Sequence, residues 1–126
     1  MVWEQLKANP ADRNLWYDVT AAAKAEHAAS LIQFASGLLQ QNVSEAIRGN
    51  VLEYMIPFLN NYPGQGEQLL IRALHSADIN HRRAALACLS KWEKRSWPEA
   101  ITAELLKLKD REGDEELKEL IRGLLL

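Results

Sequence analysis

The sequence predicts an all-α protein of seven or eight helices, arranged as about four stacked helical hairpins. Three observations lead to this prediction: long segments rich in alanine and leucine contain few β-branched residues, short breaks separate them, and apolar residues recur about every 35 positions. The chain has 126 residues, of which 48% are apolar and 25% charged. This composition is typical of one globular domain spanning residues 1–126, or of a segment of a longer stacked array.

The breaks place the helices in order along the chain. Pro10 and Asp12 open the first long segment, and the Pro63–Gly66 stretch is the clearest loop, because glycine and proline favour turns. The expected helices cover approximately residues 2–8, 12–24, 26–40, 45–60, 67–76, 80–95, 98–109 and 114–125.

Individual residues support several of these boundaries. Ser44, Asn80 and Asp114 are predicted to be N-caps, because their side-chain oxygens accept hydrogen bonds from unpaired backbone N–H groups. Pro98 suits a first helical turn, where its missing N–H is not needed. Pro57 lies inside a predicted helix, so we expect either a kink or an early end there.

The period of about 35 positions aligns two sets of residues. One set is basic: Arg13, Arg48, Arg83 and Lys118. The other is apolar: Trp16, Val51, Leu86 and Ile121. Positions three, four and seven residues after the apolar set share its helical face and are also mostly apolar, with the exceptions Thr20, Ser90 and Glu93. This face is predicted to be the buried side of the second helix in each hairpin.

One segment resembles the HEAT repeat family. In Ser76–Leu89, an aspartate turn at Asp78 precedes a pair of arginines and a helix of small residues and leucine. Ile47–Arg48 and Leu117–Lys118 resemble the same repeat position, and Arg82 rather than Arg83 takes the family's arginine position. The resemblance implies a right-handed α–α superhelix of HEAT-like hairpins. Armadillo repeats and a plain helical bundle are the alternatives.

The second helices of such a stack would line one continuous face. The edge beside their buried side is basic and contains no acidic residue, with an apolar middle formed by Leu52, Ile56 and Leu59. We therefore predict a non-enzymatic interaction or scaffold module that binds an acidic peptide or domain. The predicted contact residues are Arg13, Tyr17, Arg48, Leu52, Ile56, Arg83, Lys91, Lys94, Lys118 and Arg122. Alternatively, the arginines pair with acids in the turns and a neighbouring helix buries the apolar residues.

Two other functions are compatible with the sequence. Trp92 and Trp97 lie among cations, as in proteins that stack aromatic rings on bases, and some helical-repeat DNA glycosylases are similar to the HEAT family. Packing of both indoles is the favoured interpretation, and a net charge of −2 opposes general attraction to nucleic acid. The second alternative is a purely structural segment of a larger assembly. The leucines of the C-terminal helix pack against a further repeat of a longer solenoid, against a second copy of the chain, or against the preceding helix, and these alternatives stay open.

Catalytic signals are weak. His27, His75 and His81 are isolated, and no carboxylate or cysteine stands near them at the spacing typical of metal ligands. Neither a metal nor another cofactor is therefore expected, and no enzymatic activity is predicted. Cys88 is interpreted as a small packed residue in a reducing compartment. The longest uncharged stretch, residues 27–44, is too polar to span a membrane, so we expect a cytoplasmic protein.

Overall fold

The computed structural model describes residues 3–126 and is all-helical over that range, as predicted. A helix beginning at residue 2 was expected, but that residue lies outside the described range. The described helices are α1 (Trp3–Ala8), α2 (Arg13–Ala22), α3 (Ala25–Leu39), α4 (Glu45–Phe58), α5 (Glu67–Leu74), α6 (Ile79–Lys91), α7 (Ala100–Arg111) and α8 (Glu115–Leu125), with 3-10 turns η1 (Leu59–Asn61) and η2 (Lys94–Ser96).

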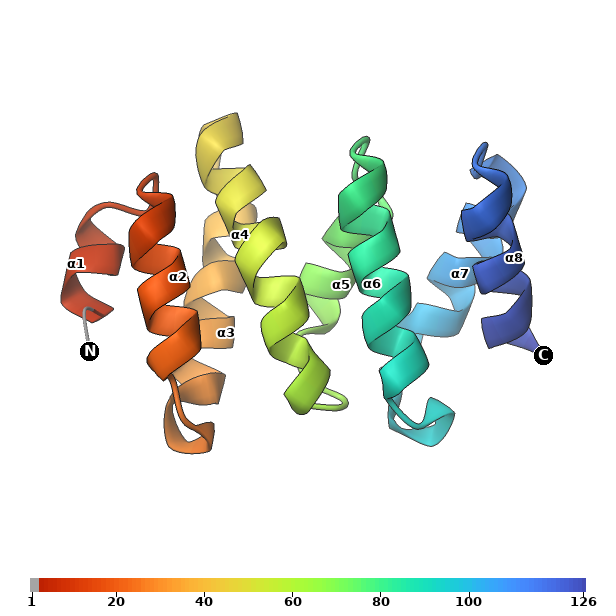
Figure 1. Cartoon of the computed structure of the whole chain (residues 1–126), viewed down its shortest axis with the longest axis horizontal. Coiled ribbons are helices and arrows are strands. Elements are labelled where there is room, and N and C mark those ends of the chain that lie inside the picture. Colours follow the sequence, from red (N-terminus) through yellow and green to blue (C-terminus); the bar gives the residue numbers. More distant parts are fainter. Residues whose placement is uncertain (1–2) are drawn as a thin grey trace.

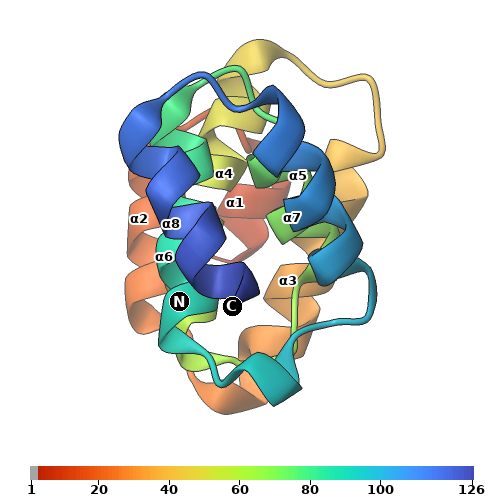
Figure 2. The same ribbon diagram turned by 90° about the vertical axis from the view of Figure 1, so that its right-hand side faces the viewer.

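The helices form two layers of stacked hairpins. Each hairpin pairs consecutive helices, α1 with α2, α3 with α4, α5 with α6 and α7 with α8. In Figure 1 the second helices α2, α4, α6 and α8 stand in a row in front, and the two ends of the chain lie at opposite ends of the row. The end-on view in Figure 2 separates them from α3, α5 and α7. Each second helix contacts the next, so equivalent side chains form rows along the stack.

The core lies between the two layers and follows the predicted apolar face. One cluster of buried side chains extends from Leu6 to Ile121. The aligned apolar residues Trp16, Val51, Leu86 and Ile121 are all at most 1% exposed. The prediction of a buried side on each second helix is therefore confirmed, whereas the handedness of the superhelix stays a prediction.

All four second helices begin with a capped first turn. Side-chain oxygens of Asp12, Ser44, Asp78 and Asp114 accept hydrogen bonds from backbone N–H groups within the first turn. Ser44 and Asp114 were predicted as N-caps, but Asn80 was wrong: its own N–H donates to Asp78, 2.8 Å away. Asp78 takes the cap because its backbone is still extended, while Asn80 is already helical.

The C-terminal ends of α6 and α4 compare differently with the sequence prediction. α6 ends at Lys91 rather than Arg95, because Trp92 turns out of the helix and its indole N–H donates to the carbonyl of Leu59 at 3.0 Å. α4 continues through Pro57 for one residue and then tightens into η1, so the expected early end is confirmed. A Cβ at Gly66 would lie 2.7 Å from Leu59, and its φ of +80° also favours glycine.

Candidate functional site

The structure gathers the ten predicted contact residues in the second-helix layer. Arg13 and Tyr17 lie on α2, and Arg83 and Lys91 lie on α6. The others are Arg48, Leu52 and Ile56 on α4, Lys94 on η2, and Lys118 and Arg122 on α8. Sharing one layer does not, however, make them one surface.

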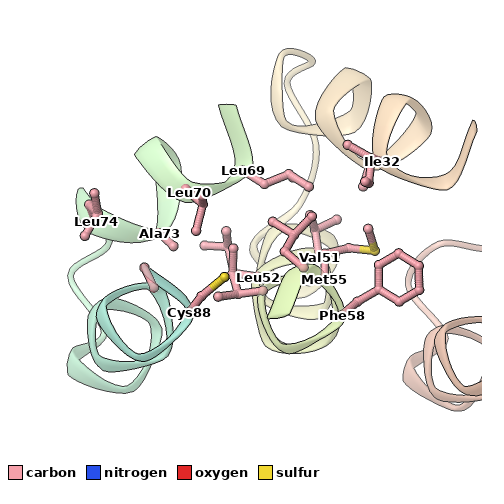
Figure 3. Close-up of a cluster of buried hydrophobic side chains, with 14 of the residues drawn as sticks. Ile32, Val51, Leu52, Met55, Phe58, Leu69, Leu70, Ala73, Leu74 and Cys88 are labelled. Carbon is pink, nitrogen blue, oxygen red and sulfur yellow. The ribbon is translucent and has the colours of Figure 1, made fainter. Parts of the chain in front are cut away.

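Leu52 and Ile56 do not form the predicted apolar middle of that surface. Leu52 is 8% exposed and Ile56 is 0% exposed, and Leu59 is equally buried. Figure 3 shows Leu52 in the core between α4 and α6, beside Cys88. The prediction failed because α4 contacts α2, α3, α5 and α6, which leaves it little open circumference.

Most of the predicted cations are neutralised by carboxylates. Arg13 pairs with Glu53 on the neighbouring helix, with 2.7 Å between Nη2 and Oε1. Arg83 reaches Glu116 across α6 and α8 at 3.9 Å. Lys118 pairs with Glu115, and Arg122 pairs with Glu119, one turn earlier on α8. The sequence prediction considered only positions along one edge of each second helix. It missed these acidic partners because they lie one turn away on the same helix or on the next helix.

Among the second helices, α6 carries the strongest ion pair, and it involves Arg82 rather than Arg83. The guanidinium donates to both carboxylate oxygens of Glu112, from Nε at 2.8 Å and from Nη2 at 3.1 Å. Its Nη1 donates to the carbonyls of Ser76 and Ala77. The Glu112 side chain is 1% exposed. Arg82 therefore fastens α6 to the turn between α7 and α8.

The surroundings of Glu112 favour its charged form. Burial alone would raise the pKa of this carboxyl, but hydrogen bonds from Arg82 and from the backbone N–H of Asp114 outweigh burial and hold the pKa below its ordinary value. Arg82 thus has a permanent carboxylate partner at neutral pH.

Arg48 is the counterpart of Arg82 one hairpin earlier. Each stands four residues after its helix N-cap, Ser44 for Arg48 and Asp78 for Arg82. Like Arg82, Arg48 donates to the carbonyl just before that N-cap, here Val43 at 3.1 Å. Within residues 3–126, no carboxylate lies within ion-pair distance of Arg48. The HEAT resemblance aligns Arg48 with Arg82, as the N-caps do, whereas the fixed period aligns Arg48 with Arg83.

In the turn before α6, Ser76 occupies the position that Glu112 occupies in the turn before α8. Each residue stands two positions before an N-cap, Glu112 before Asp114 and Ser76 before Asp78. Beside Arg48 there is therefore a hydroxyl where Arg82 has a carboxylate. An open groove of about 480 Å³, here called the α4 groove, lies at this place. It is lined by Leu39, Glu45, Arg48, Gly49, Leu52, Arg72, His75, Ser76, Ala77, Asp78 and His81.

A second unpaired cation lines the α4 groove. Arg72 on α5 is exposed, and its side chain makes no ion pair or hydrogen bond within the described part of the chain. His75 donates from Nε2 to Glu104 at 2.6 Å and accepts from Arg111 at Nδ1. The hydrogen bond from His75 is the largest cause that holds the pKa of Glu104 below its ordinary value. The groove therefore presents two arginines whose charges have no carboxylate partner.

The polar residues of the turn before α6 contact one another and the backbone. Ser76 Oγ lies 2.9 Å from His81 Nδ1 and also accepts from the backbone N–H of Asp78. Asp78 is 3.8 Å from His81 Nε2, too far to orient the imidazole as a catalytic triad requires. Cys88 is packed in the core as predicted, and burial raises the pKa of its thiol to about 12. Residues 3–126 contain no group of three candidate metal ligands.

The two tryptophans pack as expected. Trp92 is 4% exposed, and Trp97 is partly buried with its indole N–H donating to the carbonyl of Leu89 at 3.2 Å. Their ring edges are therefore occupied by backbone acceptors.

No protein-family model, curated protein or solved structure matches this chain. None of the helices in the described range is long and apolar enough to cross a membrane. Function is accordingly inferred from the chemistry of the α4 groove.

Proposed function

We propose that this chain is a HEAT-like, non-enzymatic interaction module that binds an acidic peptide or domain in the α4 groove. The proposal depends on one contrast. Arg82 is paired with Glu112, whereas its counterpart Arg48 has no carboxylate partner within residues 3–126. A carboxylate supplied by a partner would take the place beside Arg48 that Glu112 takes beside Arg82. Bidentate contacts between arginine and carboxylate are among the stronger hydrogen-bonded pairs in proteins.

The surroundings of the groove support an anionic ligand. Arg72 adds a second positive charge, and His75 and His81 line the same groove. Glu45 and Asp78 also line it, but Asp78 is engaged in capping α6. Two charged guanidinium groups at one groove raise the local concentration of an acidic ligand and orient it.

The test uses a fluorescein-labelled octapeptide of aspartate and glutamate, with an asparagine and glutamine peptide as the uncharged probe. The double variant Arg48→Gln/Arg72→Gln should raise the Kd for the acidic peptide at least tenfold, since hydrogen bonds to charged groups are each worth about 1.5–3 kcal/mol. Fluorescence anisotropy measures the Kd.

The matched control is Lys91→Gln/Lys94→Gln, which removes the same net charge outside the groove. It should change the affinity by less than a factor of about three, because exposed charges act weakly at a distance. Equal losses in both double variants would show that general charge, not the α4 groove, attracts the peptide.

Nucleic-acid binding has less support. Of the cations around the two tryptophans, Arg82, Arg83 and Arg95 already pair with carboxylates. Trp92 is only 4% exposed, and Lys94 lies over the ring of Trp97, 5.7 Å from its centroid. A salt-dependent Kd for a single-stranded oligonucleotide comparable to that for the acidic peptide would favour this alternative instead.

The last hairpin supports self-association as a second role. Leu106 on α7 and Leu120 on α8 are 51% and 40% exposed, whereas Leu124 and Leu125 pack against the core. Light scattering coupled to size-exclusion chromatography tests this role. A dimer that Leu120→Glu dissociates is the expected result, and a monomer at high concentration would reject it.

A further inference from the structure

A second groove lies on the other side of α4, and its lining is aromatic. This aromatic groove, of about 460 Å³, separates α2 from the C-terminal half of α4 and is lined mainly by Tyr17, Tyr54, Pro57 and Phe58. Tyr17 is 62% exposed although it lies beside these other aromatic and apolar side chains. A tyrosine so exposed offers a large apolar surface to a partner.

A smaller groove lies beside the α4 groove, on the side of α4 that faces α6. It has a volume of about 270 Å³ and lies between α4 and α6. It shares Leu52, Asp78 and His81 with the α4 groove. Glu53 lines both this groove and the aromatic groove. A path from the α4 groove to the aromatic groove therefore passes over Glu53.

We propose that the partner is an extended peptide that crosses α4, with its acidic residues in the α4 groove and an aromatic side chain in the aromatic groove. This inference rests on the proposed function. Charge fixes the orientation of the ligand, because Arg48 and Arg72 lie at one end of the path and Glu53 at its middle. Glu53 is already paired with Arg13, 2.7 Å away, so the middle of the path offers no unpaired charge and the central residues of the peptide are uncharged.

The path length sets the spacing in the peptide. Arg48 and Tyr54 are separated along α4 by about 9 Å, at about 1.5 Å per residue. Crossing from one side of the helix to the other adds about 10–12 Å, the usual diameter of a helix with its side chains. The diagonal is about 14 Å, which an extended chain covers in about four residues at about 3.3 Å each. The aromatic residue should therefore stand about four positions from the acidic pair.

Three labelled peptides test this arrangement by fluorescence anisotropy. The first has an aspartate–glutamate pair, three serine or threonine residues and then a tryptophan. The second replaces the tryptophan with serine, and the third places the tryptophan directly after the acidic pair. The first should bind about fivefold more tightly than the others, which is the size of one aromatic contact. Equal affinities for all three would overturn the crossing.

Protein variants locate the aromatic contact. Tyr17→Ser should reduce the affinity for the first peptide to that for the second and leave the second unchanged. Because the side chain of Tyr17 is exposed, we expect this variant to fold like the wild type. Ala21→Gln, which narrows the same groove, should have the same effect. An unchanged preference for tryptophan in both variants would overturn the inference.

The two proposals fail in different ways. If Arg48→Gln/Arg72→Gln leaves the affinity for the second, acid-only peptide unchanged, the proposed function is wrong. If that variant weakens the acid-only peptide while Tyr17→Ser has no effect on the first, the α4 groove stands and the crossing of α4 is wrong.

Discussion

The grooves beside α4 and α6 differ in whether their arginine is paired with a carboxylate: Arg82 pairs with Glu112, and Arg48 has no such partner within residues 3–126. The α6 groove, lined by Arg82, Arg111, Glu112 and their neighbours, has a volume of about 200 Å³, whereas the α4 groove has about 480 Å³. In the α6 groove the arginine is held from both sides; in the α4 groove it is held only by the carbonyl of Val43. The turn before α8 therefore binds Arg82 through Glu112, whereas the turn before α6 leaves Arg48 available to a ligand.

Removing the carboxylate of the α6 groove should have the largest effect on stability. Glu112→Gln leaves Arg82, whose side chain is 18% exposed, without its counter-charge. Breaking one partner of a buried ion pair costs about 3–5 kcal/mol, so we expect a loss of about 3 kcal/mol in the free energy of unfolding, measured with urea.

The matched control is Glu116→Gln, which removes the exposed partner of Arg83, 3.9 Å away. Its effect should be far smaller, because exposed ion pairs contribute little. Similar small losses in the two variants would mean that the carbonyls of Ser76 and Ala77 suffice to hold Arg82.

Adding a carboxylate beside Arg48 should make the α4 groove resemble the α6 groove, in which the arginine is already paired. Ser76→Glu places an acid at the position equivalent to Glu112, where it can pair with Arg48. We expect the Kd for the acidic octapeptide to rise at least tenfold, a change of about 1.4 kcal/mol, measured by anisotropy. Ser76→Ala, which lacks the charge, should retain the affinity. Undiminished binding by Ser76→Glu would place the ligand elsewhere.

The pH dependence of the unfolding free energy should also reveal the contribution of the Arg82–Glu112 ion pair. The pKa of Glu112 is lower in the folded chain than its ordinary value of about 4.3, so its contribution is fully present above that value and is lost as the pH falls through the lower folded-state pKa. Between about pH 5 and pH 2, the unfolding free energy of the wild type should therefore fall more steeply than that of Glu112→Gln. Glu104, whose pKa is also lowered, contributes a slope common to both. Parallel curves would contradict the role of Glu112.

The stack was predictable from the sequence, but the contrast between its grooves was not. Trp16, Val51, Leu86 and Ile121 are buried as predicted, because helical periodicity marks the side of a helix that faces a core. The burial of Leu52 and Ile56 depends on how many helices surround α4, which no local pattern records.

The pairing of the arginines depends on the register of each repeat. A fixed period aligned Arg48 with Arg83, whereas the N-caps align it with Arg82, because the lengths of the turns vary along the stack. The family resemblance favoured Arg82, but the identity of its partner required the position of the next turn.

The smallest expected effect is that of the surface pair between α2 and α4. Arg13 contacts Glu53 and donates from Nε to the Tyr54 hydroxyl at 3.0 Å, and these contacts, Tyr54 first, raise the pKa of Arg13. Both ends of the ion pair are exposed, so solvent and salt screen it. A double-mutant cycle of Arg13→Ala and Glu53→Ala should give a coupling energy far below the effect of Glu112→Gln, and one that decreases with added salt. A large, salt-independent coupling would mean that α2 is clamped to α4 as firmly as α6 is to the α7–α8 turn, and the contrast drawn between the grooves would then lose its physical basis.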